Sequence, residues 1–309
     1  LRPGHPLSLQ CSCAVARFPA NSTYLHDGEE DEDYTEHRRG GPLAIRPDDA
    51  PATIGRVSTA PRPRILITRA EEVRGESWND YSLCVERAGG EAAPADLAAG
   101  IEVPRDFDGL IVTAGVDVDP AGYGQQAGDY VSDTNSARDA FETALLMEAQ
   151  QRDVPILAIC RGHQMFNASR GGSLLQHLDK REPHRARRGK DGESIASGWH
   201  DVEVEPDSLL HSITGATTIH TNSRHHQAVL TSTIGSGLRI TGSADQDVVE
   251  ALEDPALSWC LSVQWHPERP EMTDAPSMRN ASTALFEAFV AACAKRAARA
   301  EPVERGATP

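Results

Sequence analysis

The sequence predicts an α/β fold in which a mostly parallel central sheet carries helices on both faces. Short apolar runs alternate with longer helical patterns between residues 64 and 172, and this β–α–β–α order is typical of parallel sheets. A second observation is the apolar run Pro155 to Ile159, which turns into a helical stretch at Cys160. Because sites in such sheets lie at the carboxyl ends of strands, Gly115 and Cys160, each at a strand end, are expected to meet.

The expected elements follow the chain in order. The first half should contain a strand at 64–68, a helix at 77–88, a strand at 107–112 and a helix at 136–151, on which Phe141 and Leu145 share an apolar face. The second half has shorter strand patterns, at 200–204, 217–229, 238–241, 248–252 and 258–265. A last amphipathic helix is expected at 277–300, with Pro276 at its start.

Composition indicates a folded domain at 63–298 with polar ends. Residues 1–62 lack periodicity and contain an acidic cluster at 27–33, so a disordered extension is expected, with a partner-binding tail as the alternative. Residues 299–309 should fray.

The net charge of the chain is strongly negative: Lys+Arg 30 against Asp+Glu 46 gives 30 − 46 = −16, which disfavours binding to nucleic acid or an anionic membrane. The six scattered cysteines indicate a reducing cytoplasm without a disulfide framework, and no apolar run reaches transmembrane length.

Basic residues gather in the segment 178–198, which contains Lys180, Arg181 and Arg185 among acidic neighbours. The simpler interpretation is a solvated surface loop. The alternative is a lid that attracts carboxylate substrates, because guanidinium groups bind carboxylates in bidentate fashion.

Cys160 occupies the bend between a strand and a helix, the arrangement of a nucleophile elbow with cysteine in place of serine. The helix N-terminus favours the thiolate and offers backbone N–H groups to a developing oxyanion. Ala158 before the bend and Gly162 after it let the backbone pass closely. The competing interpretation is a buried, inert cysteine at a strand end.

A catalytic thiol needs a base, and His266-Pro267-Glu268 follows the strand expected at 258–265. In an extended segment, His266 and Glu268 lean to the same side, so the carboxylate can orient the imidazole. The pair His225-His226 raises the alternative of a metal site. Adjacent side chains on a strand point in opposite directions, however, and no matched cluster of ligands is evident, so neither a metal nor a cofactor is expected.

Four blocks in this order resemble the class I glutamine amidotransferase superfamily, and more narrowly the γ-glutamyl-γ-aminobutyrate hydrolase family of cysteine peptidases. They are the loop 113–120 (TAGVDVDP), the elbow at 155–174, the segment 222–229 (NSRHHQAV) and the segment 263–268 (VQWHPE). The blocks span most of the domain at 63–298, which the resemblance makes a hydrolase domain of flavodoxin-like, three-layer architecture.

The resemblance also implies roles for individual residues. Cys160, His266 and Glu268 would form a catalytic triad, in which Cys160 attacks the δ-carbonyl of a γ-glutamyl amide. The backbone N–H groups of Gly115 and Arg161 would hold the oxyanion. The residues at positions where relatives contact the glutamyl group are Gln164, Ser223, Arg224, His225 and His226. The chain departs from the family pattern at Ala114-Gly115-Val116, where relatives often have consecutive glycines, and at His163, where an apolar residue is usual.

These observations leave three functions open. The first is a stand-alone hydrolase of γ-glutamyl amides, with γ-glutamyl-γ-aminobutyrate from polyamine (putrescine) catabolism as the candidate substrate. The second is a glutaminase subunit that delivers ammonia to a separate synthetase. The third is a partner-binding protein that keeps the fold. The expected partner is a small-molecule γ-glutamyl amide, with a homodimer left open and a synthetase required only by the second function.

Overall fold

The computed structural model describes residues 62–69, 76–97, 103–178, 182–188, 194–245 and 247–299. The chain divides into two units, Leu1–Ser58 and Thr59–Pro309, and the described residues all belong to the second. The expected disordered extension, apart from Arg62, and the expected frayed tail, apart from Arg299, lie outside the described residues.

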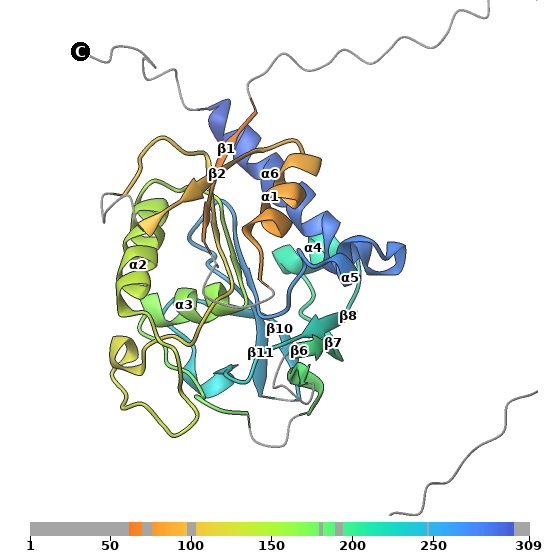
Figure 1. Ribbon diagram of the computed structural model, residues 1–309. Coiled ribbons are helices and arrows are strands. Elements are labelled where there is room, and N and C mark those ends of the chain that lie inside the picture. The colour runs from red at the N-terminus through yellow and green to blue at the C-terminus, as the bar shows by residue number, and fades with distance from the viewer. Residues whose placement is uncertain are drawn as a thin grey trace, which may run out of the picture. The chain divides into compact units, whose positions relative to one another are not determined.

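The described part of the chain is built on one ten-stranded mixed sheet (Figure 1). One half is parallel, and its neighbours in space are β2 (Glu91–Ala95), β1 (Arg64–Thr68), β3 (Gly109–Val112), β4 (Ile156–Ile159) and β12 (Cys260–Val263). The sheet continues from β12 with antiparallel strands, in the order β11 (Val248–Glu253), β10 (Arg239–Ala244), β7 (Gly198–Val204) and β8 (Thr218–Ser223), and β9 (Val229–Leu230) pairs with β11.

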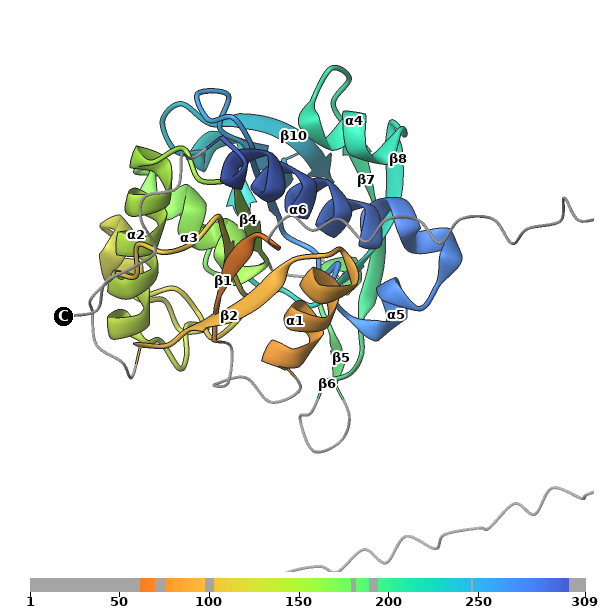
Figure 2. The same cartoon turned by 90° about the horizontal axis from the view of Figure 1, so that it is seen from above.

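Helices cover both faces of the parallel half (Figure 2). On one face, α1 (Trp78–Arg87) and α6 (Thr283–Ala297) contribute Tyr81 and Phe289 to a core that includes Ile65. On the other, α2 (Ser136–Gln151) and α3 (Arg161–Ser169) contribute Phe141 and Phe166 to a core that includes Leu66. Alternate residues of β1 thus enter opposite cores, as the twofold period of a strand requires. This arrangement confirms the predicted fold class.

Shorter elements complete the antiparallel half and the connections. They are the helices α4 (Leu209–Thr214) and α5 (Pro270–Thr273), the 3-10 helices η2 (Pro120–Tyr123), η3 (Glu182–His184), η4 (Thr231–Thr233) and η5 (Pro276–Ala281), and the hairpin β5 (Arg187–Arg188) with β6 (Ser194–Ala196). This hairpin lies within the basic segment for which a loop was expected. No helix among the described residues is long and apolar enough to cross a membrane.

Several elements differ from the sequence-based expectations. Strand β2 has the sequence EAAPA, whose alanines and proline are poor strand formers, and pairing with β1 at the edge of the sheet overrides this local preference. The single helix expected at 277–300 is interrupted at Ser282, whose hydroxyl donates to the carbonyl oxygen of Pro267 at 2.7 Å. The strand expected at 217–229 ends at Ser223, and the next residues form an irregular segment.

Candidate active site

Cys160 lies at a strained bend between β4 and α3. Its φ of 54° and ψ of −106° fall in a region that residues other than glycine rarely adopt, and such a conformation costs on the order of 1–3 kcal/mol. A Cβ built on Gly162 would lie 2.1 Å from the carbonyl oxygen of Val112, so glycine is required there. The Cys160 amide donates to the carbonyl oxygen of Val263 at 2.8 Å, which fixes the bend against β12. The predicted elbow is therefore present.

Cys160 differs from the other described cysteines, all of which are free thiols. Burial raises the pKa of Cys84 to about 12, and it raises the pKa values of Cys260 and Cys293 as well. These three thiols are packed in the two cores around the sheet. Cys160 is buried as well, but it differs from these three in its strained bend and in the side chain of Gln264 that reaches its Sγ.

Three adjacent strands end beside Cys160. In the register of the sheet, Val112 of β3 pairs with Ala158 of β4, and Ile159 of β4 pairs with Val263 of β12. The residues that follow these strands, including Gly115, Cys160 and His266, therefore share the carboxyl edge of the sheet. Gln264, the first residue after β12, lies with its side-chain amide Nε2 3.6 Å from the Sγ of Cys160.

His266 and Glu268 form a buried pair at this edge. Nδ1 of the imidazole lies 2.8 Å from Oε1 of Glu268, and each residue is only 2 % exposed. Donation from Nδ1 to the carboxylate leaves Nε2 for the thiol. Burial opposes the charged imidazole, but the Cys160 thiolate and the carboxylates of Glu268 and Glu76 together raise the pKa of His266 well above its ordinary value. The arrangement thus favours the charged imidazolium form of His266.

Residues that the sequence reasoning did not single out hold His266 in place. The side chain of Asn222 accepts a hydrogen bond from the His266 amide at 3.0 Å and donates to the His266 carbonyl oxygen at 3.1 Å. Glu76 lies 3.9 Å from Nδ1 of His266 and 3.4 Å from Arg269. Gln264 was predictable from its spacing, because it lies two residues before His266 and so leans to the same side of an extended segment. Asn222 begins the segment 222–229 on which the family resemblance rests, whereas no local pattern marked Glu76.

Gly115 and Arg161, the predicted oxyanion-hole residues, are neighbours. A Cβ on Gly115 would lie 3.0 Å from Cδ of Arg161 and 2.1 Å from Nη1 of Arg138, so a larger residue would have to displace the guanidinium of Arg138. Arg161 is the first residue of α3, and its amide therefore has no acceptor within the helix. The preceding amide, of Ala114, donates to Oη of Tyr81 at 3.2 Å.

The side chain of Arg161 belongs to a buried ionic network beneath this loop. Its guanidinium bonds Glu142 and Asp139, and Arg138 bonds Glu142 at 2.9 Å and the carbonyl oxygen of Ala114 at 2.7 Å. Burial alone would raise the pKa of Glu142, but Arg138 and Arg161 lower it below its ordinary value. The network ties the loop 113–115 to α2 and α3, so the guanidinium of Arg161 serves the scaffold.

Two of the five predicted substrate-binding residues lie among the groups around Cys160. Nε2 of Gln164 lies 3.2 Å from Oε1 of Gln264, whose own Nε2 reaches Cys160. Arg224 is half-buried and donates to Oγ of Ser197 at 3.1 Å. Burial lowers the pKa of Arg224, as does Arg269, while Glu76, Glu271 and Cys160 act in the opposite direction.

The other three point elsewhere. The hydroxyl of Ser223 donates to the carbonyl oxygen of His184 at 2.7 Å, and Nδ1 of His225 lies 2.8 Å from the carbonyl oxygen of Gln227. His226 bonds Asp117 at 2.9 Å, which ties the segment 222–229 to the loop 113–120. The side chains of Ser223 and His225 are engaged within the protein, so contact of all five with substrate stays a prediction.

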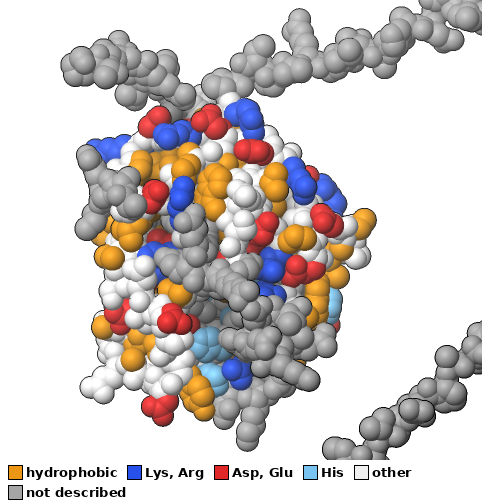
Figure 3. All heavy atoms as spheres, in the orientation of Figure 1, with side chains coloured by type: hydrophobic (Ala, Val, Ile, Leu, Met, Phe, Trp, Pro, Cys, Tyr) orange, Lys and Arg blue, Asp and Glu red, His pale blue; other side chains and the backbone are white. Residues whose placement is uncertain are grey.

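Two groups of described side chains have the composition of a metal site. Glu76, His266 and Glu268 form one, and His184, His200 and Glu250 form the other, with ligand atoms within 4.8 Å of one another in each group. The first is accounted for by the hydrogen bond between His266 and Glu268. The second lies in the antiparallel half of the sheet and contains histidines from separate elements. Histidine side chains also gather at the surface in the lower half of the face shown in Figure 3.

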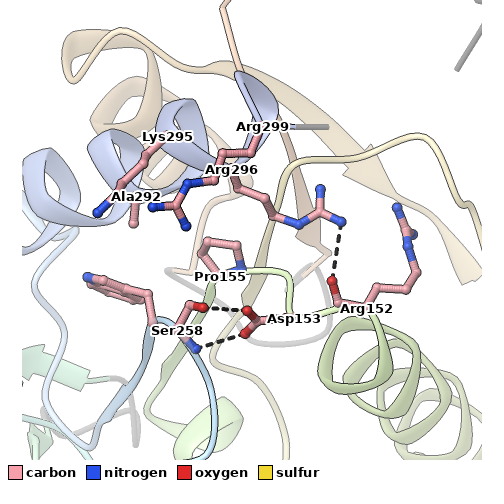
Figure 4. Close-up of a pocket in the computed structure, with 9 residues that line it drawn as sticks. Arg152, Asp153, Pro155, Ser258, Ala292, Lys295, Arg296 and Arg299 are labelled. Atoms are coloured by element: carbon pink, nitrogen blue, oxygen red, sulfur yellow. Dashed lines mark hydrogen bonds between the residues drawn. The ribbon is translucent and has the colours of Figure 1, made fainter. Parts of the chain in front are cut away.

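A pocket at the opposite edge of the sheet has a different character (Figure 4). It lies where Asp153 and Ser258 precede β4 and β12, and its basic lining residues are Arg152, Lys295, Arg296 and Arg299. Asp153 accepts a hydrogen bond from the Ser258 amide at 2.8 Å. Since ligands of such sheets bind at the carboxyl ends of strands, the edge with Cys160 is the candidate active site.

The sheet order, the elbow cysteine and the His266–Glu268 pair define a protein of the class I glutamine amidotransferase type. The profile of the peptidase C26 family matches residues 72–268, and the chain belongs to this family. The predicted family resemblance is thereby confirmed.

Named relatives cover much of the chain. The chain is 34 % identical over 224 residues to "Putative glutamine amidotransferase Rv2859c" of Mycobacterium tuberculosis, covering 68 % of this chain and 71 % of that protein. It is 31 % identical over 180 residues to the γ-glutamyl-γ-aminobutyrate hydrolase PuuD of Escherichia coli K12, covering 57 % of this chain and 67 % of that protein. The fold is similar to the glutaminase domain of Trypanosoma brucei CTPS, solved with bound acivicin, with a TM-score of 0.51 at 19 % identity over 75 % of this chain and 94 % of that one.

Proposed function

We propose that the protein is a cysteine-dependent hydrolase of γ-glutamyl amides that works through a γ-glutamyl thioester. The observation that carries this proposal is the position of Cys160 and the buried His266–Glu268 pair at the ends of adjacent parallel strands. A thiol, a base and a carboxylate that orients the base are the groups that acyl transfer needs. The peptidase C26 family and the similarity to PuuD support this substrate class.

The reaction has two halves. The Cys160 thiolate attacks the δ-carbonyl carbon, and the resulting oxyanion accepts hydrogen bonds from the amides of Gly115 and Arg161. The tetrahedral intermediate collapses as the C–N bond breaks, and the His266 imidazolium gives its proton to the leaving amine. This leaves a γ-glutamyl thioester on Cys160 and a neutral imidazole.

In the second half, His266 takes a proton from water as the water attacks the thioester carbonyl. The same two amides hold the second oxyanion, and its collapse breaks the C–S bond and releases glutamate. Glu268 stays ionised throughout, where it orients the imidazole and stabilises its charged form. Each half moves one proton through His266, so the thiolate–imidazolium pair is restored.

Recognition of the glutamyl group falls to residues around this edge. We assign Gln164 and Arg224 to it, because both lie among the groups that surround Cys160 and Arg224 carries a cation that can pair with a carboxylate. The amine side of the substrate is expected at the segment 178–198, of which the structure describes 178, 182–188 and 194–198. With γ-glutamyl-γ-aminobutyrate as substrate, the enzyme would act in polyamine catabolism.

The second candidate function is a glutaminase subunit that supplies ammonia to a separate synthetase. It is supported by the similarity to the M. tuberculosis protein named as a glutamine amidotransferase. The same Cys160 chemistry would serve both functions, because glutamine is itself a γ-glutamyl amide. The two functions differ in whether free glutamine is the preferred substrate and in whether a partner raises its hydrolysis.

The test is glutamate release by the purified full-length chain from γ-glutamyl-γ-aminobutyrate, other γ-glutamyl amines and glutamine. We expect release from at least one γ-glutamyl amine and none from the Cys160→Ala variant. Cys260→Ala is the matched control, because Cys260 is also buried but begins β12 and lies away from the elbow. Activity on glutamine alone would favour the glutaminase subunit. Release by Cys160→Ala at the wild-type rate would refute the proposed chemistry.

A further inference from the structure

A second cluster of buried titratable side chains lies in the antiparallel half of the sheet. It consists of His184 in η3, His200 in β7, His225 after β8 and Glu250 in β11, and we call it the His–Glu cluster. Nδ1 of His184, Nε2 of His200 and Nε2 of His225 lie 3.3, 3.2 and 3.5 Å from the same oxygen, Oε1 of Glu250. Glu250 and His184 are fully buried, and His225 is 4 % exposed.

The polar atoms that face one another in this cluster lack hydrogen-bond partners among the described residues. These atoms are both carboxylate oxygens of Glu250, Nδ1 of His184, both ring nitrogens of His200 and Nε2 of His225. Buried polar atoms are nearly always bonded, because an unmet one costs about 1–3 kcal/mol. Several such atoms around one point therefore indicate that a group belongs between them.

The outer nitrogens of two imidazoles show which atoms are free to act as ligands. Nδ1 of His225 lies 2.8 Å from the carbonyl oxygen of Gln227, to which it can only donate. Nε2 of His184 lies 2.9 Å from Oδ2 of Asp245 and donates there. In the neutral rings, the nitrogens that face Glu250 then carry lone pairs. Lone pairs directed at a carboxylate repel it unless a cation lies between them.

The distances from the ring nitrogens to Glu250 are close to those between neighbouring ligands of a tetrahedral metal centre. Zn²⁺ binds imidazole nitrogen and carboxylate oxygen at about 2.0–2.2 Å, so neighbouring ligand atoms of a tetrahedron lie about 3.3–3.6 Å apart. The three nitrogen–oxygen distances of 3.2–3.5 Å fall close to this range. We propose that His184, His200 and Glu250, whose ligand atoms all lie within 4.8 Å of one another, bind a Zn²⁺ ion, and that His225 packs beside this site against Glu250. Asp245 would hold the ring of His184, as carboxylates commonly do for zinc-bound histidines.

An ionic network without metal is the competing explanation, with protonated histidines around Glu250. Charge-assisted N–H···O bonds are about 2.7–2.9 Å long and nearly linear. The contacts to Glu250 are longer, and the facing atoms lack hydrogen-bond geometry. These distances favour an ion at the centre over direct N–H···O bonds.

The proposed metal site would stabilise the residues that position Cys160 and His266. The amide of Gln264 donates to the carbonyl oxygen of Glu250 at 2.8 Å, and the side chain of Gln264 reaches Cys160. His225 lies in the same segment as Asn222, which holds the backbone of His266. An ion shared by η3, β7 and β11 would fix Glu250, and the contact of His225 with Glu250 at 3.5 Å would extend this support to the segment of Asn222.

The test measures metal in the full-length chain, purified without a polyhistidine tag. Elemental analysis should find one Zn²⁺ per chain, and chelation should lower the melting temperature until Zn²⁺ is restored. The variants His200→Ala and Glu250→Gln should each lose the stoichiometric Zn²⁺. His220→Ala is the matched control, because His220 lies on the adjacent strand β8 but is exposed and bonded to Asp201, and it should retain the ion.

Co²⁺ substitution keeps the proposal testable if those variants fail to fold. The wild-type chain, stripped of metal and loaded with Co²⁺, should show the intense visible absorption of a tetrahedral nitrogen and oxygen site, and Zn²⁺ should abolish it. A folded wild-type chain that neither contains nor takes up Zn²⁺ would overturn the proposal and leave the ionic network. Retention of one Zn²⁺ by both ligand variants would overturn it too. Neither readout depends on glutamate release, so failure of the proposed function would leave this test intact.

Discussion

The two ends of the parallel strands differ in what they offer a ligand. At the carboxyl ends, Cys160, His266 and Glu268 are at most 9 % exposed, and the backbone of Cys160 is strained. At the amino ends, the pocket in Figure 4 is lined by cations, of which Lys295 and Arg299 are exposed. A pocket lined by charged residues is therefore not by itself a reactive site. A reactive site needs oriented groups that meet at one point, and such groups lie at the carboxyl edge.

Removal of the base at the carboxyl edge should have the largest effect. His266→Ala deletes the group that moves both protons, and general acid–base catalysis contributes about 10²–10⁴-fold. We expect kcat/KM for the best γ-glutamyl amide to fall by that factor, as measured by steady-state glutamate release. Circular dichroism should show an unchanged fold. A variant within about threefold of wild type, well short of that range, would separate His266 from the chemistry.

The scaffold under the carboxyl edge should be the next most sensitive feature. Glu142→Gln leaves Arg138 and Arg161 buried without their shared carboxylate. Breaking a buried pair in this way costs about 3–5 kcal/mol, which urea denaturation measures.

The matched control is Glu148→Gln on the same helix. Glu148 pairs with Arg152 near the surface, and such pairs contribute about 0–1 kcal/mol. Equal losses of stability in the two variants would mean that the network around Arg161 is not the support that we describe.

The pH dependence of the reaction should report the charge of His266. Its pKa is raised, chiefly by Cys160, Glu268 and Glu76 acting against burial, so the imidazolium persists through neutral pH and is lost as pH rises through the raised value. The kcat/KM of the wild type should therefore stay level through neutral pH and fall on the alkaline side. In Glu268→Gln, which removes one of these negative charges, the alkaline limb should move to lower pH. An unmoved or upward-shifted limb would contradict the assignment.

Changes at the amino edge should have the smallest effect. Lys295→Ala and Arg299→Ala each remove an exposed cation from the pocket in Figure 4. We expect the stability to change by no more than about 0.5 kcal/mol and kcat/KM to remain at the wild-type value. A loss of activity comparable to that of His266→Ala would show that the pocket takes part in the reaction.

Local signals made the active-site edge predictable from sequence. The elbow was visible as an apolar run followed by Cys160 and Gly162, and the His266–Glu268 pair as two residues on one side of an extended segment. The parallel half followed from alternating apolar runs, and the predicted bounds of α2 match the structure. These features depend on neighbours within a few residues, which a pattern can capture.

Long-range pairing explains what the sequence did not reveal. Glu250 meets His184 and His200 through the antiparallel half of the sheet and η3, whose positions no local pattern indicated. Adjacent histidines do point apart, since His225 faces Glu250 and His226 faces Asp117. The group with the composition of a metal site, His184, His200 and Glu250, comes from three distant elements. Strand β2 was missed because an edge pairing, and not its own residues, makes it a strand.

The most direct test of the central claim is to capture the acyl-enzyme. The full-length chain would be mixed with its best γ-glutamyl amide, quenched in acid during turnover and analysed by intact mass and peptide mapping. We expect a mass increase of one γ-glutamyl group, located on Cys160 and absent from Cys160→Ala. An adduct on another residue, or unchanged hydrolysis by Cys160→Ala, would contradict it.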